Sequence, residues 1–163
     1  MFSLSEMFEV RDARIEDAGE VAGVLVRSIT QLCQEDHHDN LETITRWTLN
    51  KTPEIVVRWI ANPDVLMLVA VETDRVAAVG GAIRPDHIVL NYVDPSCRLR
   101  GASTLLMAEL ERRLSQAGAN ILHLESTRTA RSFYRSRGWQ EVGETVDKFG
   151  MPGFRMVKPA TPA

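Results

Sequence analysis

The sequence predicts an α/β protein of the α+β type, with a mixed, mostly antiparallel sheet of seven strands flanked by about four helices. Apolar segments of strand length alternate with segments of helical periodicity along the chain. Short turns join the strands in the middle of the chain, which makes them antiparallel, whereas a helix precedes the strand at Ile121. A single domain is expected over residues 1–158, followed by a short frayed tail at 159–163.

Local patterns place each element. The expected strands are residues 8–14, 65–71, 76–83, 88–93, 121–125, 139–146 and 154–157, and the expected helices begin near Asp17, Leu41, Pro53, Ala102 and Thr129. Thr52 is a favourable N-cap for the helix at Pro53. Residues 65–71 are apolar throughout, so this strand is expected to be buried on both faces. Turns are expected at 73–74, at 85–86 and around 149–153, the last between the two C-terminal strands.

Composition excludes several classes of protein. The 163 residues are 44% hydrophobic and 25% charged with a net charge of −3, so there is no basic surplus for binding nucleic acid. No apolar run approaches ~18 residues and the first residues lack a basic flank, so we expect no membrane span, no secretion signal and a cytoplasmic protein. Cys33 and Cys97 form no C-x-x-C pair, which argues against a disulfide framework or a metal site of that type.

The most informative segment is the loop between the strand that ends at Val93 and the helix that begins near Ala102. A strand, a tight loop with Gly101 and a helix start follow one another here. The first N–H groups of a helix have no partner inside it, and the helix dipole adds partial positive charge. Arg98 and Arg100 add full charges beside them. The sequence therefore predicts a phosphate or pyrophosphate site.

This loop resembles the acetyl-CoA loop of the GCN5-related N-acetyltransferase family. Val93, Pro95, Arg98 and Gly101 match the family pattern. Ser103 stands where the family prefers glycine or alanine, and Leu99 stands where glycine is common.

A second segment, residues 127–139, resembles another motif of the same family. Ala130, Phe133, Tyr134, Gly138 and Trp139 match its spacing, and Thr127 replaces an asparagine that commonly contacts the cofactor. Two motifs in family order on the expected elements indicate the acyl-CoA N-acyltransferase fold over about residues 10–157.

The resemblance implies a binding site for acetyl-CoA, the co-substrate, between the fourth and fifth strands. In the family a strand bulge there frees a backbone N–H for the thioester carbonyl, a role that falls here to the backbone near Tyr92 and Val93. The residues implied to bind the cofactor are Tyr92, Val93, Arg98, Leu99, Arg100, Gly101, Ala102, Ser103, Thr104, Thr127, Ala130 and Phe133.

Tyr134 stands where the family keeps its general acid. A phenol of pKa about 10 remains protonated at neutral pH and can donate to the leaving thiolate. Full transfer to a thiolate of pKa about 8.5 is uphill by about 2 kcal/mol, a gap that desolvation of the thiolate narrows. The alternative is that Tyr134 is only a core aromatic residue of an amphipathic helix.

The general base is not identified by a motif. Glu125, on the fifth strand beside the expected opening, is one candidate, and the alternative is a solvated carboxylate at a strand end. His37 and His38 lie in a polar, acidic break at 34–40 that is expected to be a solvated loop without a metal site. In the family this loop borders the acceptor site, so the resemblance implies that its carboxylates attract a cationic amine. His123, Trp47 and Trp59 are expected in the core, and Cys97 lacks an activating histidine.

These observations predict an acetyl-CoA-dependent N-acetyltransferase that acts on the primary amine of a small molecule or peptide, without a metal. The alternative is a non-catalytic domain that binds acyl-CoA as a sensor or partner, which the departures at Ser103 and Thr127 keep open. A dinucleotide oxidoreductase is disfavoured because the loop has one glycine where the dinucleotide fingerprint needs three. The family resemblance also makes a homodimer possible.

Overall fold

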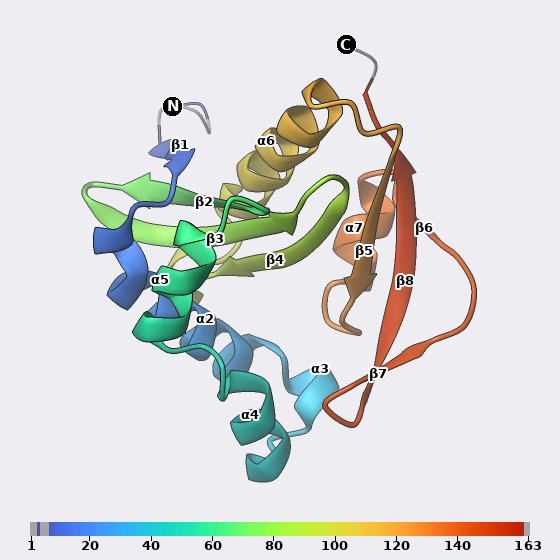
Figure 1. Cartoon of the computed structure of the whole chain (residues 1–163). Helices are drawn as coiled ribbons and strands as arrows, with labels where there is room; N and C mark the ends of the chain where they lie inside the picture. Colours follow the sequence, from blue (N-terminus) through green and yellow to red (C-terminus); the bar gives the residue numbers. More distant parts are fainter. Residues whose placement is uncertain (1–2, 4–6, 162–163) are drawn as a thin grey trace.

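One mixed sheet of eight strands organises the computed structural model, which describes residues 3 and 7–161 (Figure 1). The strands are β1 (Glu9–Asp12), β2 (Val65–Glu72), β3 (Arg75–Ile83), β4 (His87–Val93), β5 (Ile121–Ser126), β6 (Gln140–Glu141), β7 (Val146–Lys148) and β8 (Met151–Pro159). The helices are α2 (Ala18–Leu32), α3 (Gln34–His37), α4 (Leu41–Thr48), α5 (Pro53–Ala61), α6 (Ala102–Gln116) and α7 (Arg131–Ser136), with single-turn helices η1 (Ile15–Asp17) and η2 (Pro95–Cys97). None of the helices described is long and apolar enough to span a bilayer.

The sheet has the order β1-β2-β3-β4-β5-β8-β6, with β7 also paired to β8. Every pair is antiparallel except β4 and β5, which are parallel and are connected through α6. Pairing of these two strands is confined to His87 with His123 and Ile88 with Leu124. Beyond these residues β4 and β5 run apart, as Figure 1 shows, and this opening positions the candidate site.

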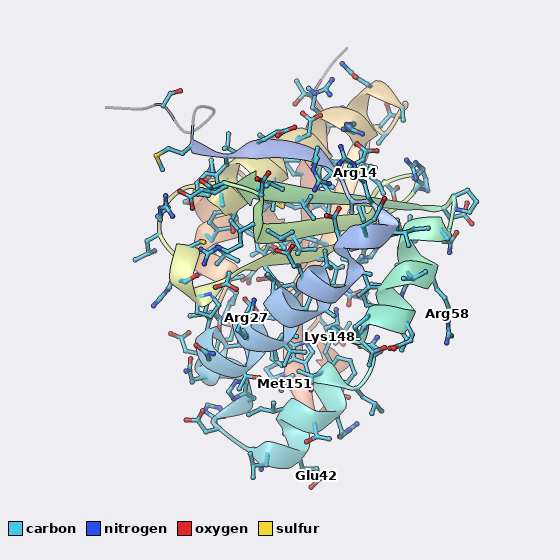
Figure 2. All side chains as sticks on the ribbon, turned by 90° about the vertical axis from the view of Figure 1, so that its left-hand side faces the viewer. Arg14, Arg27, Glu42, Arg58, Lys148 and Met151 are labelled. Carbon is cyan, nitrogen blue, oxygen red and sulfur yellow. The ribbon has the colours of Figure 1, made fainter. Side chains whose placement is uncertain are left out.

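Helices cover both faces of the sheet, which confirms that the strand predicted at 65–71 is buried on both sides. Alternate residues of β2 belong to different cores. Leu68 packs in the core that contains Leu106 and Leu110 of α6, whereas Val69 packs in the core that contains Leu25 of α2 and Val56 of α5. Figure 2 looks onto the second face, where α2 crosses in front of the sheet.

The two C-terminal strands differ from the prediction of one strand at 139–146 opposite 154–157. The first segment is divided into β6 and β7, which pair with different halves of β8, and β8 is longer than expected. Gly143, with a φ of 68°, lies in the connection between them. A residue in this left-handed region interrupts an extended strand, so the sheet has eight strands where seven were predicted.

The prediction of a frayed tail from residue 159 is wrong for its first three residues. Pro159 pairs with Ile121 at the end of β8, and the backbone N–H of Ala160 donates to Asn120 O at 2.9 Å. The N–H of Thr161 donates to Ser115 Oγ at 3.1 Å. Residues 162–163 lie outside the described residues.

Leu110 of α6 tests the packing of this helix on the sheet. Its side chain is fully buried and lies against Gly80 of β3, where an added Cβ would come within 3.0 Å of Leu110 Cδ1. We expect Leu110→Ala to lower the free energy of unfolding by about 2–5 kcal/mol, because a cavity replaces contacts that relax only partly. Urea unfolding measures the change. Leu41→Ala, at an exposed position, is the control and should stay within about 0.5 kcal/mol of the parent.

Candidate active site

Three cavities meet at the opening between β4 and β5, and Tyr92 and Thr127 line all of them. The first, of about 430 Å³, lies on the side of the loop before α6 and is called the loop cavity. The second, of about 300 Å³, lies on the side of α4 and α5 and is called the helix-side cavity. A small cavity of about 40 Å³ lies between the diverging strands, with Tyr134 and Glu125 in its wall. Two separate chambers thus share one narrow junction.

All of the residues predicted to bind the cofactor line the loop cavity: Tyr92, Val93, Arg98, Leu99, Arg100, Gly101, Ala102, Ser103, Thr104, Thr127, Ala130 and Phe133. Gly101 adopts a φ of 88° and is the N-cap of α6. Leu99, with a φ of 63°, is also left-handed and is 90% exposed. These turns bring the unpaired N–H groups at the start of α6 to the cavity wall, where they can bind an anion.

Ion pairs fix both ends of this loop. Asp94, at its start, accepts from the backbone N–H of Ser96 at 3.0 Å and from the Arg27 guanidinium at 2.6 Å. The Arg100 guanidinium is paired with the Glu72 carboxylate of β2. The sequence indicated Arg98 and Arg100 as phosphate ligands. Both line the cavity, but the Arg100 guanidinium is already paired with Glu72, whereas Arg98 is exposed.

Tyr134 lies on α7 and is 6% exposed. Its hydroxyl oxygen accepts from Asn91 Nδ2 at 3.2 Å. Burial raises the pKa of Tyr134 to about 12, although the hydrogen bond from Asn91 acts in the opposite direction. The ring also packs edge-on against Phe133 and Trp139, with centroids 5.4 and 6.1 Å apart. Tyr134 is therefore a core aromatic residue that also lines the small cavity between the diverging strands.

Asn91 is a site residue that the sequence reasoning missed. It lines both the loop cavity and the small cavity, and its Oδ1 atom is buried without a hydrogen-bond partner in the described part of the chain. A buried amide oxygen without a partner is costly. A polar residue within the apolar run of β4 was the available signal, because an unpaired asparagine is unusual in a buried strand.

The backbone of β4 directs selected N–H groups into the opening. The N–H of Asp94 donates to Ala77 O at 2.8 Å. Because hydrogen-bonding direction alternates along an antiparallel strand, the N–H groups of Val93 and Asn91 point away from β3, whereas that of Tyr92 points toward it. The bulge in β4 is at Val89, between the paired residues Ile88 and Leu90, and not at 92–93 as the resemblance implied.

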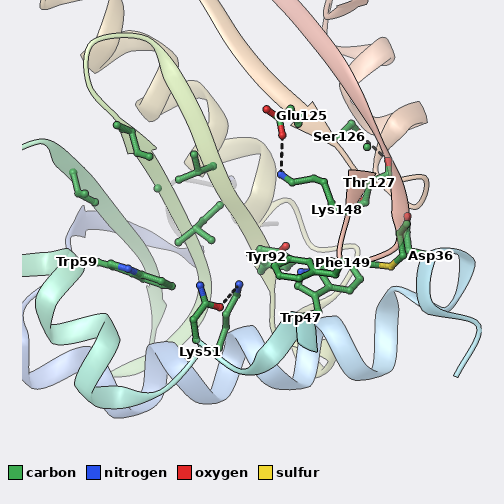
Figure 3. A pocket seen from close by; sticks show the side chains of 18 of the residues that line it. Asp36, Trp47, Lys51, Trp59, Tyr92, Glu125, Ser126, Thr127, Lys148 and Phe149 are labelled. Atoms are coloured by element: carbon green, nitrogen blue, oxygen red, sulfur yellow. Dashed lines mark hydrogen bonds and ion pairs between the residues drawn. The ribbon is translucent and has the colours of Figure 1, made fainter. Parts of the chain in front are cut away.

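The helix-side cavity combines aromatic and charged walls (Figure 3). Its aromatic side chains are Trp47, Trp59, Tyr92 and Phe149. Trp47 is buried as predicted, yet both tryptophans face a cavity rather than a sealed core. The ionisable side chains other than Tyr92 are Asp36, Lys51, Glu125 and Lys148. Such a chamber suits an apolar ligand that carries charged groups.

Glu125 lines both the helix-side cavity and the small cavity. Its carboxylate lies 3.1 Å from Lys148 Nζ and 3.9 Å from His87 Nε2. The side chain is 28% exposed. Glu125 is thus an ion-paired carboxylate in the wall of the junction, and not the freely solvated carboxylate at a strand end that was the alternative.

The acidic break at 34–40 is not a solvated loop. It contains the short helix α3, and the side chains of Asp36 and His37 are buried. Asp36 accepts from the backbone N–H groups of Arg128 and Thr129 at 2.6 and 3.1 Å, so it secures the turn before α7. His37 Nε2 lies 2.8 Å from Ile29 O, and its Nδ1 accepts from the N–H of Asp39. Both groups are occupied by structural hydrogen bonds.

Two other sequence interpretations change or gain detail. His123 is not a core residue: its side chain is 44% exposed and stacks with His87, with ring centroids 6.4 Å apart. Cys97 is fully buried and lines the loop cavity, within 3 Å of the Arg75 guanidinium. In the described residues, no three His, Cys, Asp or Glu side chains gather into a metal-binding group.

Comparison with known proteins assigns the fold. A family model described as "Acetyltransferase (GNAT) domain" matches residues 29–160. The chain belongs to the GNAT acetyltransferase family. The GNAT match includes both segments that resembled the family in sequence and the whole opening between β4 and β5. Among curated proteins, no match to this chain was found.

Solved GNAT structures superimpose over nearly the whole chain. A GCN5-related N-acetyltransferase from Rhodopseudomonas palustris is 26% identical, with a TM-score of 0.84 over 94% of this chain and 96% of that one. The PaiA N-acetyltransferase from Thermoplasma acidophilum, in complex with coenzyme A, is 21% identical, with a TM-score of 0.77 over 93% and 98%. The aminoglycoside 6'-N-acetyltransferase from Enterococcus faecium is 15% identical, with a TM-score of 0.71 over 95% and 98%. The last two likenesses show the fold alone.

The two tyrosines of this GNAT domain, Tyr92 and Tyr134, give a direct test of the site's burial. Burial raises the pKa of Tyr134 to about 12 and that of Tyr92 further. At about pH 10, where half of the tyrosines in an unfolded chain are ionised, we expect almost no tyrosinate absorbance from the folded protein. Because both folded-state pKa values are raised, the stability these residues contribute is complete below about pH 10 and is lost as the pH rises.

The control is the same alkaline titration in concentrated denaturant, where both phenols should ionise normally. Half-ionisation of either tyrosine near its ordinary pKa in the folded protein would contradict the buried placement of that hydroxyl.

Proposed function

We propose that this protein transfers the acetyl group of acetyl-CoA to a primary amine. The observation that carries the proposal is the junction at which the two larger cavities meet beside Tyr134 and Glu125. One cavity holds the acyl donor and the other the amine, so the reacting atoms meet between β4 and β5. Family membership supports acetyl transfer as the reaction class.

The loop cavity supplies what a coenzyme A diphosphate requires. The N–H groups of Ala102, Ser103 and Thr104 at the start of α6 bind the phosphate oxygens, and the helix dipole favours their charge. Arg98 adds a full positive charge. Thr127 Oγ1 accepts from the N–H of Ala130 at 3.2 Å, so the residue that replaces the family asparagine secures the turn beside the cavity.

The thioester then lies along β4, where Val93 and Asn91 direct their N–H groups into the opening. These groups donate hydrogen bonds to the carbonyl oxygen as negative charge develops on it, which is worth about 3 kcal/mol for one donor in comparable sites. The amine nitrogen forms a bond to the carbonyl carbon, and the bond from that carbon to sulfur breaks. Glu125 takes the proton that the ammonium loses before the attack, and Tyr134 donates its proton to the departing sulfur. The proton that the nitrogen loses after the attack restores the phenol of Tyr134.

The raised pKa of Tyr134 is compatible with this role because the same surroundings act on a thiol. Cys33 lines the loop cavity, and burial raises the pKa of its thiol to about 12. Burial acts in the same direction on a coenzyme A thiolate that leaves beside Tyr134, so the raised pKa of the phenol is accompanied by a raised pKa of the thiol that receives its proton.

Glu125 is suited to receive the amine. An aliphatic ammonium costs roughly 4 kcal/mol to deprotonate at pH 7, so a carboxylate that first attracts the cation and then takes its proton lowers the barrier. Glu125 has Lys148 as its present ion-pair partner at 3.1 Å. An incoming ammonium competes with Lys148 for the same carboxylate.

The direct experiment is incubation of the purified protein with acetyl-CoA and a panel of amines, amino acids and peptides, following release of free thiol. Release that depends on both substrates supports the enzyme. Tight binding of acetyl-CoA by calorimetry without thiol release across the panel would instead favour a sensor domain. Absence of binding by the folded protein would contradict the proposal as a whole.

We expect Tyr134→Phe to lower kcat at least about tenfold, because the proton donor to the sulfur is removed while the ring stays in place. Coenzyme A affinity, measured by calorimetry, should change little. Ser136→Ala is the matched control: it removes a hydroxyl from the same helix, one that bonds only Phe133 O, and should retain activity. Unchanged turnover in Tyr134→Phe would remove this residue from the mechanism.

Glu125→Gln keeps the size of the side chain and removes its charge. At pH 7 we expect kcat/KM for the amine to fall about tenfold or more, with a smaller loss at higher pH, where more of the amine is already neutral. A pH profile of both proteins measures this convergence. Glu144→Gln, at an exposed position outside the cavities, is the control. A constant ratio of the two profiles at all pH values would exclude Glu125 as the proton acceptor.

A further inference from the structure

Lys51 is a buried cation in the wall of the helix-side cavity. It lies in the connection between α4 and α5 and is 8% exposed. Its Nζ atom donates to Asn50 Oδ1 at 2.7 Å and lies 5.7 Å from the centroid of the Phe149 ring. Both partners are uncharged. In the described part of the chain Lys51 has no ion pair.

The other charged groups of this cavity are already engaged. Lys148 is paired with Glu125 at 3.1 Å. Asp36 accepts backbone hydrogen bonds from Arg128 and Thr129. Figure 3 shows Lys51 rising from the helical side of the cavity, across from Lys148 and Glu125 on the strands. Lys51 is therefore the charged group of the helix-side cavity that is open to pair with a charged group of a ligand.

We propose that Lys51 binds a carboxylate of the acceptor, so that the preferred substrate is an amine that also carries a carboxylate, with an apolar body between the two groups. This inference rests on the proposed function, because it assigns the helix-side cavity to the acceptor. The amine lies at Glu125 beside the junction, the apolar body lies among Trp47, Trp59 and Phe149, and the carboxylate reaches Lys51.

The physical basis is the cost of a buried charge without a counter-ion. Removing an ammonium from water costs several kcal/mol per ion unless an opposite charge compensates. A carboxylate ligand supplies that compensation through a charge-assisted hydrogen bond, which is about twice as strong as a neutral one. A neutral group of the same shape leaves Lys51 uncompensated, so the cavity discriminates by charge more than by size.

The protonation of Lys51 agrees with this environment. Burial and, as a smaller contribution, the positive charge of Lys148 together lower its pKa to about 8. The remaining ionisable side chains of the cavity are Asp36, Tyr92 and Glu125. Only the protonated form of Lys51 attracts a carboxylate, so the preference should weaken as the pH rises above about 8.

The test compares two acceptors of nearly the same shape, the charged para-(aminomethyl)benzoate and the neutral para-(aminomethyl)benzamide. The parent protein should have a KM for the benzoate about tenfold to hundredfold below that for the benzamide, the range for a hydrogen bond to a charged group. Lys51→Met should abolish this preference. Lys51→Arg should retain the preference, and in this variant the preference should no longer weaken above pH 8. Arg58→Met, which removes an exposed cation of α5 outside the cavity, is the matched control and should behave as the parent.

Binding is measured separately from turnover, through the fluorescence of the tryptophans that line the cavity. If the benzoate binds in preference to the benzamide but is not acetylated, the proposal for Lys51 stands and the proposed function fails for this acceptor. If both amines are acetylated with equal KM, or if Lys51→Met keeps the preference, the inference is overturned. It is also overturned if neither compound binds.

Discussion

The site depends on a parallel strand pair that is hydrogen-bonded over only a short length before the two strands diverge. β4 and β5 are paired only at His87–His123 and Ile88–Leu124, and the remaining lengths of both strands diverge. A sheet that continued its ladder would satisfy the N–H groups of Asn91 and Val93 and close the space between the two larger cavities. Because the ladder ends, those groups are free to serve a ligand, and the two cavities share a junction.

Helix packing and hydrogen bonds hold the elements around this opening in place. α6 connects the two strands across one face and is packed on β3 through Leu110 and Gly80. Asp36, from α3, binds the turn before α7 and so fixes the position of Tyr134 relative to β4. The contacts that maintain the opening thus lie outside it, and the polar groups within the opening remain available to bind substrates.

The two larger cavities differ in the chemistry that they offer. The loop cavity presents backbone N–H groups and Arg98, a combination suited to phosphate. The helix-side cavity presents aromatic rings with Glu125 and Lys51 at different places on its wall, a combination suited to an apolar molecule with two opposite charges. Tyr134 lines neither of these cavities but the small cavity between the diverging strands, where we propose that the bond to sulfur breaks.

The sequence by itself determined the family, most of the elements up to about residue 138 and twelve of the residues that line the loop cavity, because these depend on contiguous motifs and on local periodicity. Asn91 and Lys51 were not predicted, and the roles of Asp36 and His37 were wrongly assigned to a solvated loop. Only the tertiary structure decided these points, because burial, hydrogen-bond partners and the absence of a counter-ion depend on segments distant in the sequence. The sequence does not show whether a lysine is solvated or buried. Its pKa and its need for a counter-ion depend on the groups that surround it in the folded protein.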